Sequence, residues 1–432
     1  MQKTVKIISL GCSKNTVDSE KLLKQLQYAD YNTSYHGHDK KTDIVIVNTC
    51  GFINDAKEES VNTIIELAEA RKRGEIGELY VMGCLSERYR QELEKEIPEV
   101  DQYFGVNKPA EILRHLGNDY KPAADPERIL SGPPHYAYLK ISEGCDRRCA
   151  FCAIPGIRGR YRSAPVDELV KETEILTDRG VKEVILIAQD LSYYGIDRYN
   201  RHMLTELCEA LLGIDRVEWL RLHYLYPHSL QKDLLELMKD NPRICNYIDM
   251  PVQHISDKIL SAMRRGHSSY DTKKLLYDIR NILPEAAIRS TLITGYPGET
   301  DKEFRELLEF VREFRFDRLG VFTYSHEEDT WAHKKFRDDI PMKVKKERAD
   351  EIMAVQQEIS LQNNIAMIGR KLTVIIDRQE QDYFVGRTEY DSPEVDQEVL
   401  VRGGEGKLKP GDFCKVQISS ATEYDLEAVL AG

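Results

Sequence analysis

Residues 143–152 read Glu143-Gly-Cys145-Asp-Arg-Arg-Cys149-Ala-Phe-Cys152, and they closely follow a strand-like run at Ala137–Ile141. Thiolates at spacings of four and three residues can surround one face of a compact metal cluster from a single loop. A structural zinc site would require a fourth ligand nearby, usually as paired Cys-x-x-Cys units, and the neighbouring sequence offers none. Three cysteines instead fit a four-iron, four-sulfur cluster whose fourth iron stays open for a substrate or cofactor.

The section from residue 135 to 365, in which this loop stands, alternates strand-like runs with helical patterns. Its candidate strands are Ala137–Ile141, Val184–Ala188, Val217–Leu222, Tyr247–Met250, Ala287–Thr294 and Arg318–Thr323. Helical spacing of apolar residues marks Asp167–Arg179, Leu230–Lys239 and Asp301–Phe314, and a charged helix follows from about Met342 to Ile368. Six such repeats predict a full or partial (β/α) barrel of parallel strands.

Polar or conformationally special residues follow the carboxyl ends of these predicted strands. They are Gln189, His223, Gln253, His254, Gly295, Glu299, Ser325 and His326. Barrel enzymes build their active sites at that face, so we expect these side chains to converge over one mouth. Each histidine taken singly has the plainer interpretation of a hydrogen-bonded structural residue.

The flanking sections differ in kind. Residues 1–120 alternate strand-like and helical runs: Val5–Leu10, Asp18–Tyr28, Asp43–Asn48, Ala56–Arg73 and Glu78–Met82. This alternation predicts a doubly wound parallel sheet. Residues 121–134 contain four prolines and are predicted to be a linker. Residues 366–432 hold short β-rich runs between Gly, Pro and Asp, for which we expect a small antiparallel β-barrel.

Three cysteines of the first section, Cys12, Cys50 and Cys84, each come directly after a strand-like run. Loops that follow parallel strands of a doubly wound sheet lie along one edge, where ligands bind. These thiols are therefore expected to meet as a second three-thiolate site. The alternative is three unrelated buried thiols, since free cysteine is often buried. The remaining cysteines fit no motif and are expected to be structural: Cys208, Cys245 and Cys414.

Charge narrows the choice of partner. The 432 residues carry 61 basic and 73 acidic side chains, for a net charge of −12, which disfavours nucleic acid as a substrate. Residues 366–432 hold eight basic and thirteen acidic side chains, so this section is expected to attract a basic protein. No apolar run approaches the roughly eighteen residues of a membrane span. The start lacks a signal-peptide cleavage site, so we expect a cytoplasmic protein with reduced thiols.

The cysteine loop resembles that of the radical S-adenosylmethionine enzymes, and the whole chain resembles their methylthiotransferase branch. The matching segments are Gly11-Cys-Ser-Lys-Asn-Thr-Val-Asp-Ser-Glu20, Gly83-Cys-Leu-Ser-Glu-Arg-Tyr89, the cysteine loop through Arg162, Gly386-Arg-Thr and Ser392-Pro-Glu-Val-Asp396. The resemblance implies an N-terminal domain with an auxiliary cluster, a radical-generating barrel and a small C-terminal β-barrel called TRAM.

The resemblance also implies cofactors and their ligands. Cys145, Cys149 and Cys152 would hold one four-iron, four-sulfur cluster, and Cys12, Cys50 and Cys84 would hold the other. S-adenosylmethionine would contact Gln189 and Asp190, which stand where the family often has Gly-Gly-Glu. The further implied cofactor contacts are Arg289, Thr291, Gly295 and Glu299. The chemistry implied is hydrogen abstraction from an unactivated carbon, sulfur insertion and methyl transfer, and it requires a sulfur donor and a low-potential electron donor.

Two branches of this family differ in substrate: one modifies an adenosine in transfer RNA, and the other the β-carbon of an aspartate in the twelfth small-subunit ribosomal protein. Lys14, Asp190-Leu-Ser-Tyr-Tyr-Gly195 and Ser392-Pro-Glu-Val-Asp396 resemble the ribosomal-protein branch, and the acidic last section agrees. Transfer-RNA modification remains the nearest alternative. A zinc-dependent RNA-binding protein, and a radical enzyme whose first domain is purely structural, are two more.

Five arginines surround the cysteine loop: Arg147, Arg148, Arg158, Arg160 and Arg162. Guanidinium groups at this position can balance thiolate charge, hold the cofactor carboxylate or pair with an acidic side chain of the target by bidentate bonding. The sequence leaves these roles open.

Overall fold

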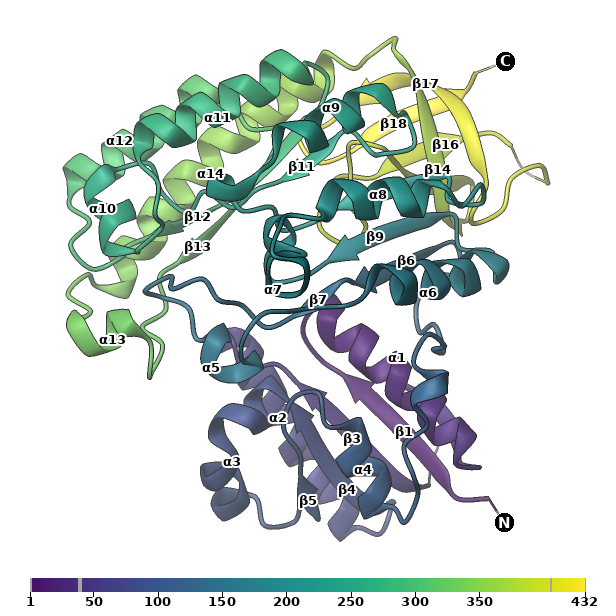
Figure 1. The fold of residues 1–432 in the computed structure, drawn as a ribbon. Coiled ribbons are helices and arrows are strands. Elements are labelled where there is room, and N and C mark those ends of the chain that lie inside the picture. The colour runs from purple at the N-terminus through teal and green to yellow at the C-terminus, as the bar shows by residue number, and fades with distance from the viewer. Residues whose placement is uncertain (1, 38–40, 405, 432) are drawn as a thin grey trace.

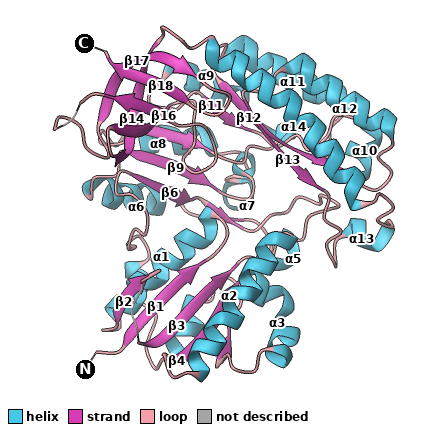
Figure 2. Cartoon of the chain, turned by 180° about the vertical axis from the view of Figure 1, so that it is seen from behind, coloured by secondary structure: helices cyan, strands magenta, loops and turns pink. Residues whose placement is uncertain are grey.

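A computed structural model describes residues 2–37, 41–404 and 406–431. The chain forms an N-terminal sheet domain, a central barrel domain and a C-terminal β-barrel that packs against the central one (Figure 1). Seen from behind, the strands of the N-terminal sheet lie below the central domain, with helix α1 between the two (Figure 2).

The N-terminal sheet has strand order β2-β1-β3-β4-β5, and every pairing is parallel. Its elements are β1 (Thr4–Ser9), α1 (Ser13–Tyr28), β2 (Asn32–Tyr35), β3 (Thr42–Thr49), α2 (Asn54–Lys72), β4 (Ile76–Gly83), α3 (Cys84–Glu96), β5 (Gln102–Tyr103) and α4 (Pro109–His115). Ile44 and Ile46 pack toward α1 and α4, while Val45 and Val47 pack toward α2 and α3. Helices on both faces explain why β3 is apolar at consecutive positions. The predicted doubly wound sheet is confirmed; β2 and β5 are additional short strands at its edges.

The central domain is an open barrel of six parallel strands, as predicted. Sheets β6-β9-β10 and β11-β12-β13 are joined through an isolated parallel bridge between Leu220 and Ile244. The strands are β6 (Tyr136–Lys140), β9 (Glu183–Ile187), β10 (Trp219–Leu222), β11 (Tyr247–Asp249), β12 (Ala287–Thr294) and β13 (Arg318–Thr323), with a small ribbon of β7 (Ser142–Glu143) and β8 (Arg162–Ser163). The helices are α5 (Ile154–Arg158), α6 (Val166–Asp178), α7 (Ile196–Tyr199), α8 (Leu204–Leu212), α9 (Lys232–Asp240), α10 (Asp257–Ala262), α11 (Ser269–Ile282), α12 (Asp301–Phe314), α13 (Trp331–Lys335) and α14 (Met342–Ile365).

The C-terminal module is a closed five-stranded barrel of order β14-β15-β16-β18-β17. Its strands are β14 (Lys371–Glu380), β15 (Tyr383–Thr388), β16 (Val399–Arg402), β17 (Phe413–Ala421) and β18 (Leu426–Leu430). The expectation of a wholly antiparallel barrel is wrong at one pairing, because β16 and β18 run parallel. After β16 the chain crosses to pair β17 with β14, and β18 then returns antiparallel to β17, beside β16.

Buried ion pairs fix the C-terminal barrel against the amino-terminal ends of the central strands. Arg387 contacts Glu183, the first residue of β9, at 2.8 Å, and neither side chain is more than 2% exposed. Asp391 pairs with Arg318, the first residue of β13. The cysteine loop follows the opposite ends of these strands, so the two features flank the barrel at its two ends.

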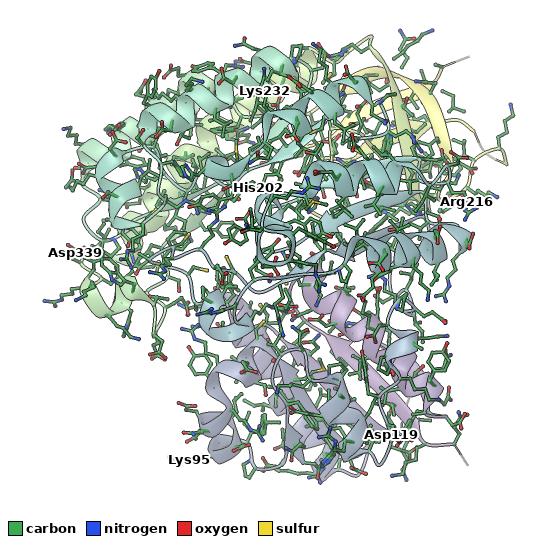
Figure 3. All side chains as sticks on the ribbon, viewed as in Figure 1. Lys95, Asp119, His202, Arg216, Lys232 and Asp339 are labelled. Atoms are coloured by element: carbon green, nitrogen blue, oxygen red, sulfur yellow. The ribbon has the colours of Figure 1, made fainter. Side chains whose placement is uncertain are left out.

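Charged side chains spread over all three domains. Lys95 and Asp119 lie on the N-terminal domain, Arg216 and Lys232 on the central one, and Asp339 near α13 (Figure 3). Within the described ranges, no helix combines the length and the apolar character needed to cross a membrane.

Candidate functional site

The cysteine loop between β7 and α5 is held by backbone contacts on several sides. Gly144 has a φ of +76°, and a Cβ atom there would lie 2.1 Å from the carbonyl oxygen of Arg160, so only glycine fits. The amide of Cys145 donates to the Gly159 carbonyl at 3.1 Å. Ala150 donates to Met263 at 2.9 Å and accepts from Ala332 at 2.8 Å. These contacts preset the positions of the three cysteines.

Burial raises the pKa of Cys145 and of Cys152 to about 12. Hydrogen-bond donors nevertheless approach the sulfurs: the Arg147 amide lies 3.4 Å from Cys145 Sγ, and an Arg265 guanidinium nitrogen lies 3.4 Å from Cys149 Sγ. Such donors stabilise thiolates, and a bound metal deprotonates its thiols outright. This donor set therefore fits an iron–sulfur cluster.

A cavity of about 700 Å³ opens over the three cysteines, within the size range of small-molecule sites. Cationic side chains gather around it: Arg88, Arg147, Arg148, Arg160 and Arg264. The sequence identified the arginines of the loop; Arg88 belongs to the matching segment Gly83–Tyr89 but was not singled out, and Arg264 lies outside every motif. The acidic side chains Glu87, Asp146, Glu328 and Asp329 line the cavity as well, so it offers partners for both an ammonium and a carboxylate of a ligand.

The end of β9 faces the same loop. Asp190 is 1% exposed and accepts from Arg147 Nε at 2.7 Å, and Tyr161 donates to its carbonyl at 2.9 Å. Burial raises the pKa of Asp190, although Arg147 opposes this. The second carboxylate oxygen of Asp190 and the amide oxygen of Gln189 have no hydrogen-bond partner within the described residues. Buried unpartnered acceptors at this place fit a ligand that supplies donors.

The loop after β12 also reaches the cysteine loop, since Tyr296 shares a buried cluster with Ala150. Gly295 donates to Glu299 at 3.0 Å, and Glu299 pairs with Arg348 of α14 at 2.7 Å. Gly295 and Glu299 are thus connected to α14 by hydrogen bonds. Thr291, within β12, accepts a hydrogen bond at its carbonyl from the Gln253 amide at 2.9 Å.

Arg289 lies elsewhere. It stands five residues before the end of β12, roughly 16 Å along the strand. Its guanidinium contacts Asp249 at 3.1 Å and Asp396 of the C-terminal barrel at 3.4 Å. The structure therefore does not bring Arg289 together with the cysteine loop.

The predicted histidines separate as well. His223 is buried against Ser392 of the C-terminal barrel at 2.9 Å, and burial lowers its pKa well below the usual range. His254 Nδ1 accepts from the Ser256 amide at 3.0 Å, and its Nε2 lies 3.4 Å from Glu299 without a hydrogen bond among the described residues. His326 contacts the Tyr324 hydroxyl at 2.9 Å. These contacts match the plainer interpretation of hydrogen-bonded structural histidines.

The three N-terminal cysteines stand at the carboxyl ends of adjacent strands β1, β3 and β4. Glycines let their loops approach. A Cβ on Gly11 would lie 2.7 Å from Cys50 Cβ, and a Cβ on Gly51 would lie 2.9 Å from the carbonyl carbon of Cys84. The expectation that these strand ends converge is confirmed by this close approach.

Burial raises the pKa of Cys50, and that of Cys84 to about 11; for both thiols the charge of Arg158 acts in the opposite sense. Arg158 belongs to the central domain and is 4% exposed. It donates to Asn15 of α1 at 2.6 Å and to Glu143 at 2.9 Å. In the sequence Arg158 belongs to the basic patch of the barrel loop. In the structure its guanidinium instead acts on the N-terminal cysteines Cys50 and Cys84.

Cys84 also packs with Ile157 of α5 and Ala153, the neighbour of Cys152. One cysteine of the N-terminal group therefore packs against the segment that follows the barrel cysteines. Within the described ranges, no three His, Cys, Asp or Glu side chains are spaced to hold a single metal ion. Each group offers three thiols, the number that holds a four-iron cluster with one open iron.

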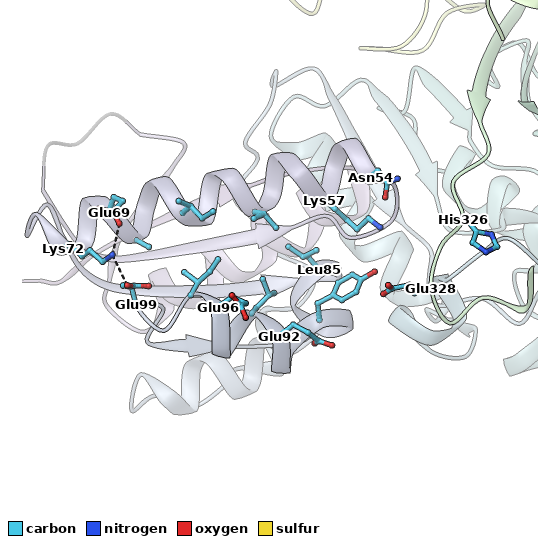
Figure 4. Close-up of a pocket in the computed structure, with 16 residues that line it drawn as sticks. Asn54, Lys57, Glu69, Lys72, Leu85, Glu92, Glu96, Glu99, His326 and Glu328 are labelled. Atoms are coloured by element: carbon cyan, nitrogen blue, oxygen red, sulfur yellow. Dashed lines mark hydrogen bonds and ion pairs between the residues drawn. The ribbon is translucent and has the colours of Figure 1, made fainter. Parts of the chain in front are cut away.

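A larger cavity, of about 840 Å³, lies between α2 and α3 (Figure 4). Its walls include Ile65 and Leu93, and Lys72 bridges Glu69 and Glu99 at one end. None of its lining residues is a cysteine, although Glu328 lines both this cavity and the one over the barrel cysteines.

Comparison with known proteins divides the chain in the same way. Residues 4–105 match the Uncharacterized protein family UPF0004, residues 139–311 the Radical SAM superfamily and residues 368–430 the TRAM domain. Among solved structures, the radical S-adenosylmethionine methyltransferase TsrM of Kitasatospora setae, with tryptophan and aza-SAM bound, aligns with a TM-score of 0.55 at 14% identity, over 74% of this chain and 73% of that one. This likeness concerns the fold alone.

Full-length relatives are much closer. The ribosomal protein uS12 methylthiotransferase RimO of Christiangramia forsetii is 52% identical over 98% of this chain and 93% of that protein. The RimO proteins of Porphyromonas gingivalis and Phocaeicola vulgatus are 53% and 49% identical, over 98% and 99% of both chains. The chain therefore belongs to the RimO family of radical S-adenosylmethionine methylthiotransferases.

Proposed function

We propose that this chain adds a methylthio group to ribosomal protein uS12, at the β-carbon of an aspartate. The observation that carries the proposal is the packing of Cys84 against Ile157 and Ala153, which follow the barrel cysteines, with Arg158 donating to both Asn15 of α1 and Glu143. When bound, two four-iron, four-sulfur clusters and S-adenosylmethionine would supply the radical, sulfur and methyl chemistry that side chains lack.

The protein's own residues bind and orient these groups. Cys145, Cys149 and Cys152 would hold the radical-generating cluster. Asp190 keeps one buried oxygen free to accept from an ammonium group of S-adenosylmethionine, while Arg147 fixes its other oxygen.

Cys12, Cys50 and Cys84 would hold the auxiliary cluster. The Arg158 guanidinium offsets thiolate charge there and joins the N-terminal domain to the barrel loop. A site divided between two domains needs both of them in register, and this supports a catalytic role for the N-terminal domain.

The partner proposed is a basic protein. Part of the acidity of the C-terminal barrel is used internally, because Asp377, Asp391 and Asp396 form buried ion pairs with arginines. A groove of about 560 Å³ between this barrel and α14 nevertheless presents carboxylates that form no ion pair among the described residues: Asp350, Glu423 and Asp425. Basic ribosomal protein segments would gain favourable electrostatics there.

The activity also requires a sulfur donor and a low-potential electron donor, and its substrate would place the enzyme with ribosomes in the cytoplasm. The test is an anaerobic reaction of the reconstituted enzyme with uS12 that carries deuterium at the aspartate β-carbon. We expect a methylthio mass increase on uS12 and deuterium in 5′-deoxyadenosine. Modification of transfer RNA, with uS12 unchanged, would contradict the proposal and favour the transfer-RNA alternative.

A further inference from the structure

Lys14 is a buried cation without a carboxylate partner. The residue is 7% exposed, in the first turn of α1. Its ammonium lies 3.4 Å from the centroid of the Tyr224 ring, and no carboxylate of the described residues pairs with it. Buried charges in proteins are normally paired, because the desolvation of an unpaired ion is costly. Its nitrogen keeps some contact with solvent and has no ion pair among the described residues, so it can receive an anion that arrives from outside.

Neighbouring buried cations differ from Lys14 in this respect. Lys140 pairs with Asp18 and Glu143, and Arg158 pairs with the same two carboxylates. Lys14 therefore stands apart from this network of paired charges.

Lys14 lies where the N-terminal domain meets the barrel. It follows Cys12 by two residues, yet its ammonium lies on Tyr224, which follows β10 of the barrel. Tyr224 adopts a φ of +63°, which is unusual for a bulky residue and is typical of functional sites. Its amide donates to Asp249 at 3.0 Å and its carbonyl accepts from Leu191 at 3.1 Å. The aromatic surface below the ammonium is therefore fixed.

We propose that Lys14 binds the side-chain carboxylate of the substrate aspartate, an inference that rests on the proposed function. The reacting β-carbon is bonded directly to that carboxylate, so an ion pair with Lys14 positions the carbon between the barrel and the N-terminal cysteines. A cation on an aromatic face is held less strongly than in a charge-assisted hydrogen bond, so the carboxylate can recruit the ammonium from the ring.

The test compares the reconstituted wild-type enzyme with Lys14→Met, Lys14→Arg and the control Lys24→Met. Lys24 is on the same helix and also lies over a tyrosine, at 4.7 Å, but it pairs with Glu127 at 3.3 Å. The ligands are recombinant uS12, uS12 with the target Asp→Asn change, and S-adenosylmethionine alone. Anaerobic binding gives the Kd of each, and iron content reports the clusters.

We expect Lys14→Met to weaken binding of uS12 about 10- to 100-fold, with the Kd of S-adenosylmethionine and the iron content unchanged. The Asp→Asn change in uS12 should weaken its binding to the wild-type enzyme by a similar factor. It should have little effect on the Kd that uS12 shows for Lys14→Met. Lys14→Arg should restore part of the affinity, and Lys24→Met should match the wild type.

Two results would overturn the assignment of Lys14. One is that Lys14→Met binds the two forms of uS12, with aspartate or asparagine at the target position, with the same ratio of Kd values as the wild type. The other is a loss confined to S-adenosylmethionine, which would assign Lys14 to the cofactor carboxylate instead. A wild-type enzyme that leaves uS12 unmodified would contradict the proposed function itself, so the two failures are distinguishable. The Asp→Asn ligand tests the wild-type enzyme and does not depend on how a variant folds.

Discussion

Arg158→Met removes the guanidinium that joins the N-terminal domain to the barrel loop. The side chain is 1% exposed and contacts Glu143 at 2.9 Å and Asp18 at 3.3 Å. After the substitution, Lys140 alone remains beside these two carboxylates. Breaking a buried ion pair by removing one partner typically costs about 3–5 kcal/mol. Because Lys140 still compensates one carboxylate, we expect a loss at the lower end, about 3 kcal/mol.

A loss of this size lowers the Tm of a domain of this length by about 6–12 °C, at about 2–4 °C per kcal/mol. The pH dependence should change as well. Burial alone would raise the pKa of Glu143, but Lys140 and Arg158 hold it well below the usual range. Stability from a depressed carboxyl pKa is present above the unfolded value and is lost as pH falls through the folded one. Without Arg158 the folded-state pKa of Glu143 moves back toward its unfolded value, so the loss of stability in acid should be smaller and complete at a higher pH.

The assay is anaerobic scanning calorimetry across pH 4–8, together with iron analysis after reconstitution. Arg162→Met is the matched control, because Arg162 belongs to the same basic patch but is exposed. We also expect Arg158→Met to retain less auxiliary iron, since the pKa of Cys84 rises further without the guanidinium. If Arg158→Met melts within about 2 °C of Arg162→Met and keeps both clusters, the reasoning about this ion pair is refuted.

Three further changes test other parts of the account. Cys12→Ala should lower reconstituted iron from about eight to about four per chain and abolish methylthiolation while S-adenosylmethionine cleavage persists; retained methylthiolation would favour a purely structural N-terminal domain. Gly144→Ala should destabilise the fold by at least about 1–2 kcal/mol, because its φ is left-handed. The clash with Arg160 should also displace Cys145 and so reduce the absorption of the barrel cluster. An unchanged iron content would contradict this displacement. Burial lowers the pKa of His267 from 6.5 to about 4, so stability should fall as pH drops from 6.5 to 4. His267→Gln should reduce this dependence of the Tm on pH. An unchanged dependence would show that His267 has the same pKa in the folded and unfolded states, contrary to the expectation.

The sequence predicted the elements that repeat regularly. Strand runs such as Val184–Ala188 agree with β9, because parallel strands covered on both faces read as continuous apolar segments. The convergence of Cys12, Cys50 and Cys84 was predictable too, since all three follow strands of one parallel sheet.

Long-range contacts were beyond sequence reasoning. The parallel pairing of β16 with β18 depends on which edge a crossing strand reaches, and short strands of similar composition do not encode that. Arg158 belongs to the barrel loop in sequence but contacts the other domain, and Arg289 is bound by Asp396 from a module more than a hundred residues away. Such placements arise only when separate domains pack.

Mass spectrometry of uS12 from ribosomes tests the central claim most directly. The samples come from a strain that lacks the gene and from the same strain complemented with the wild-type chain or with Cys12→Ala. The account predicts a methylthiolated aspartate with the wild-type chain alone. Unmodified uS12 in the wild-type sample, accompanied by a change in transfer-RNA methylthiolation, would contradict it.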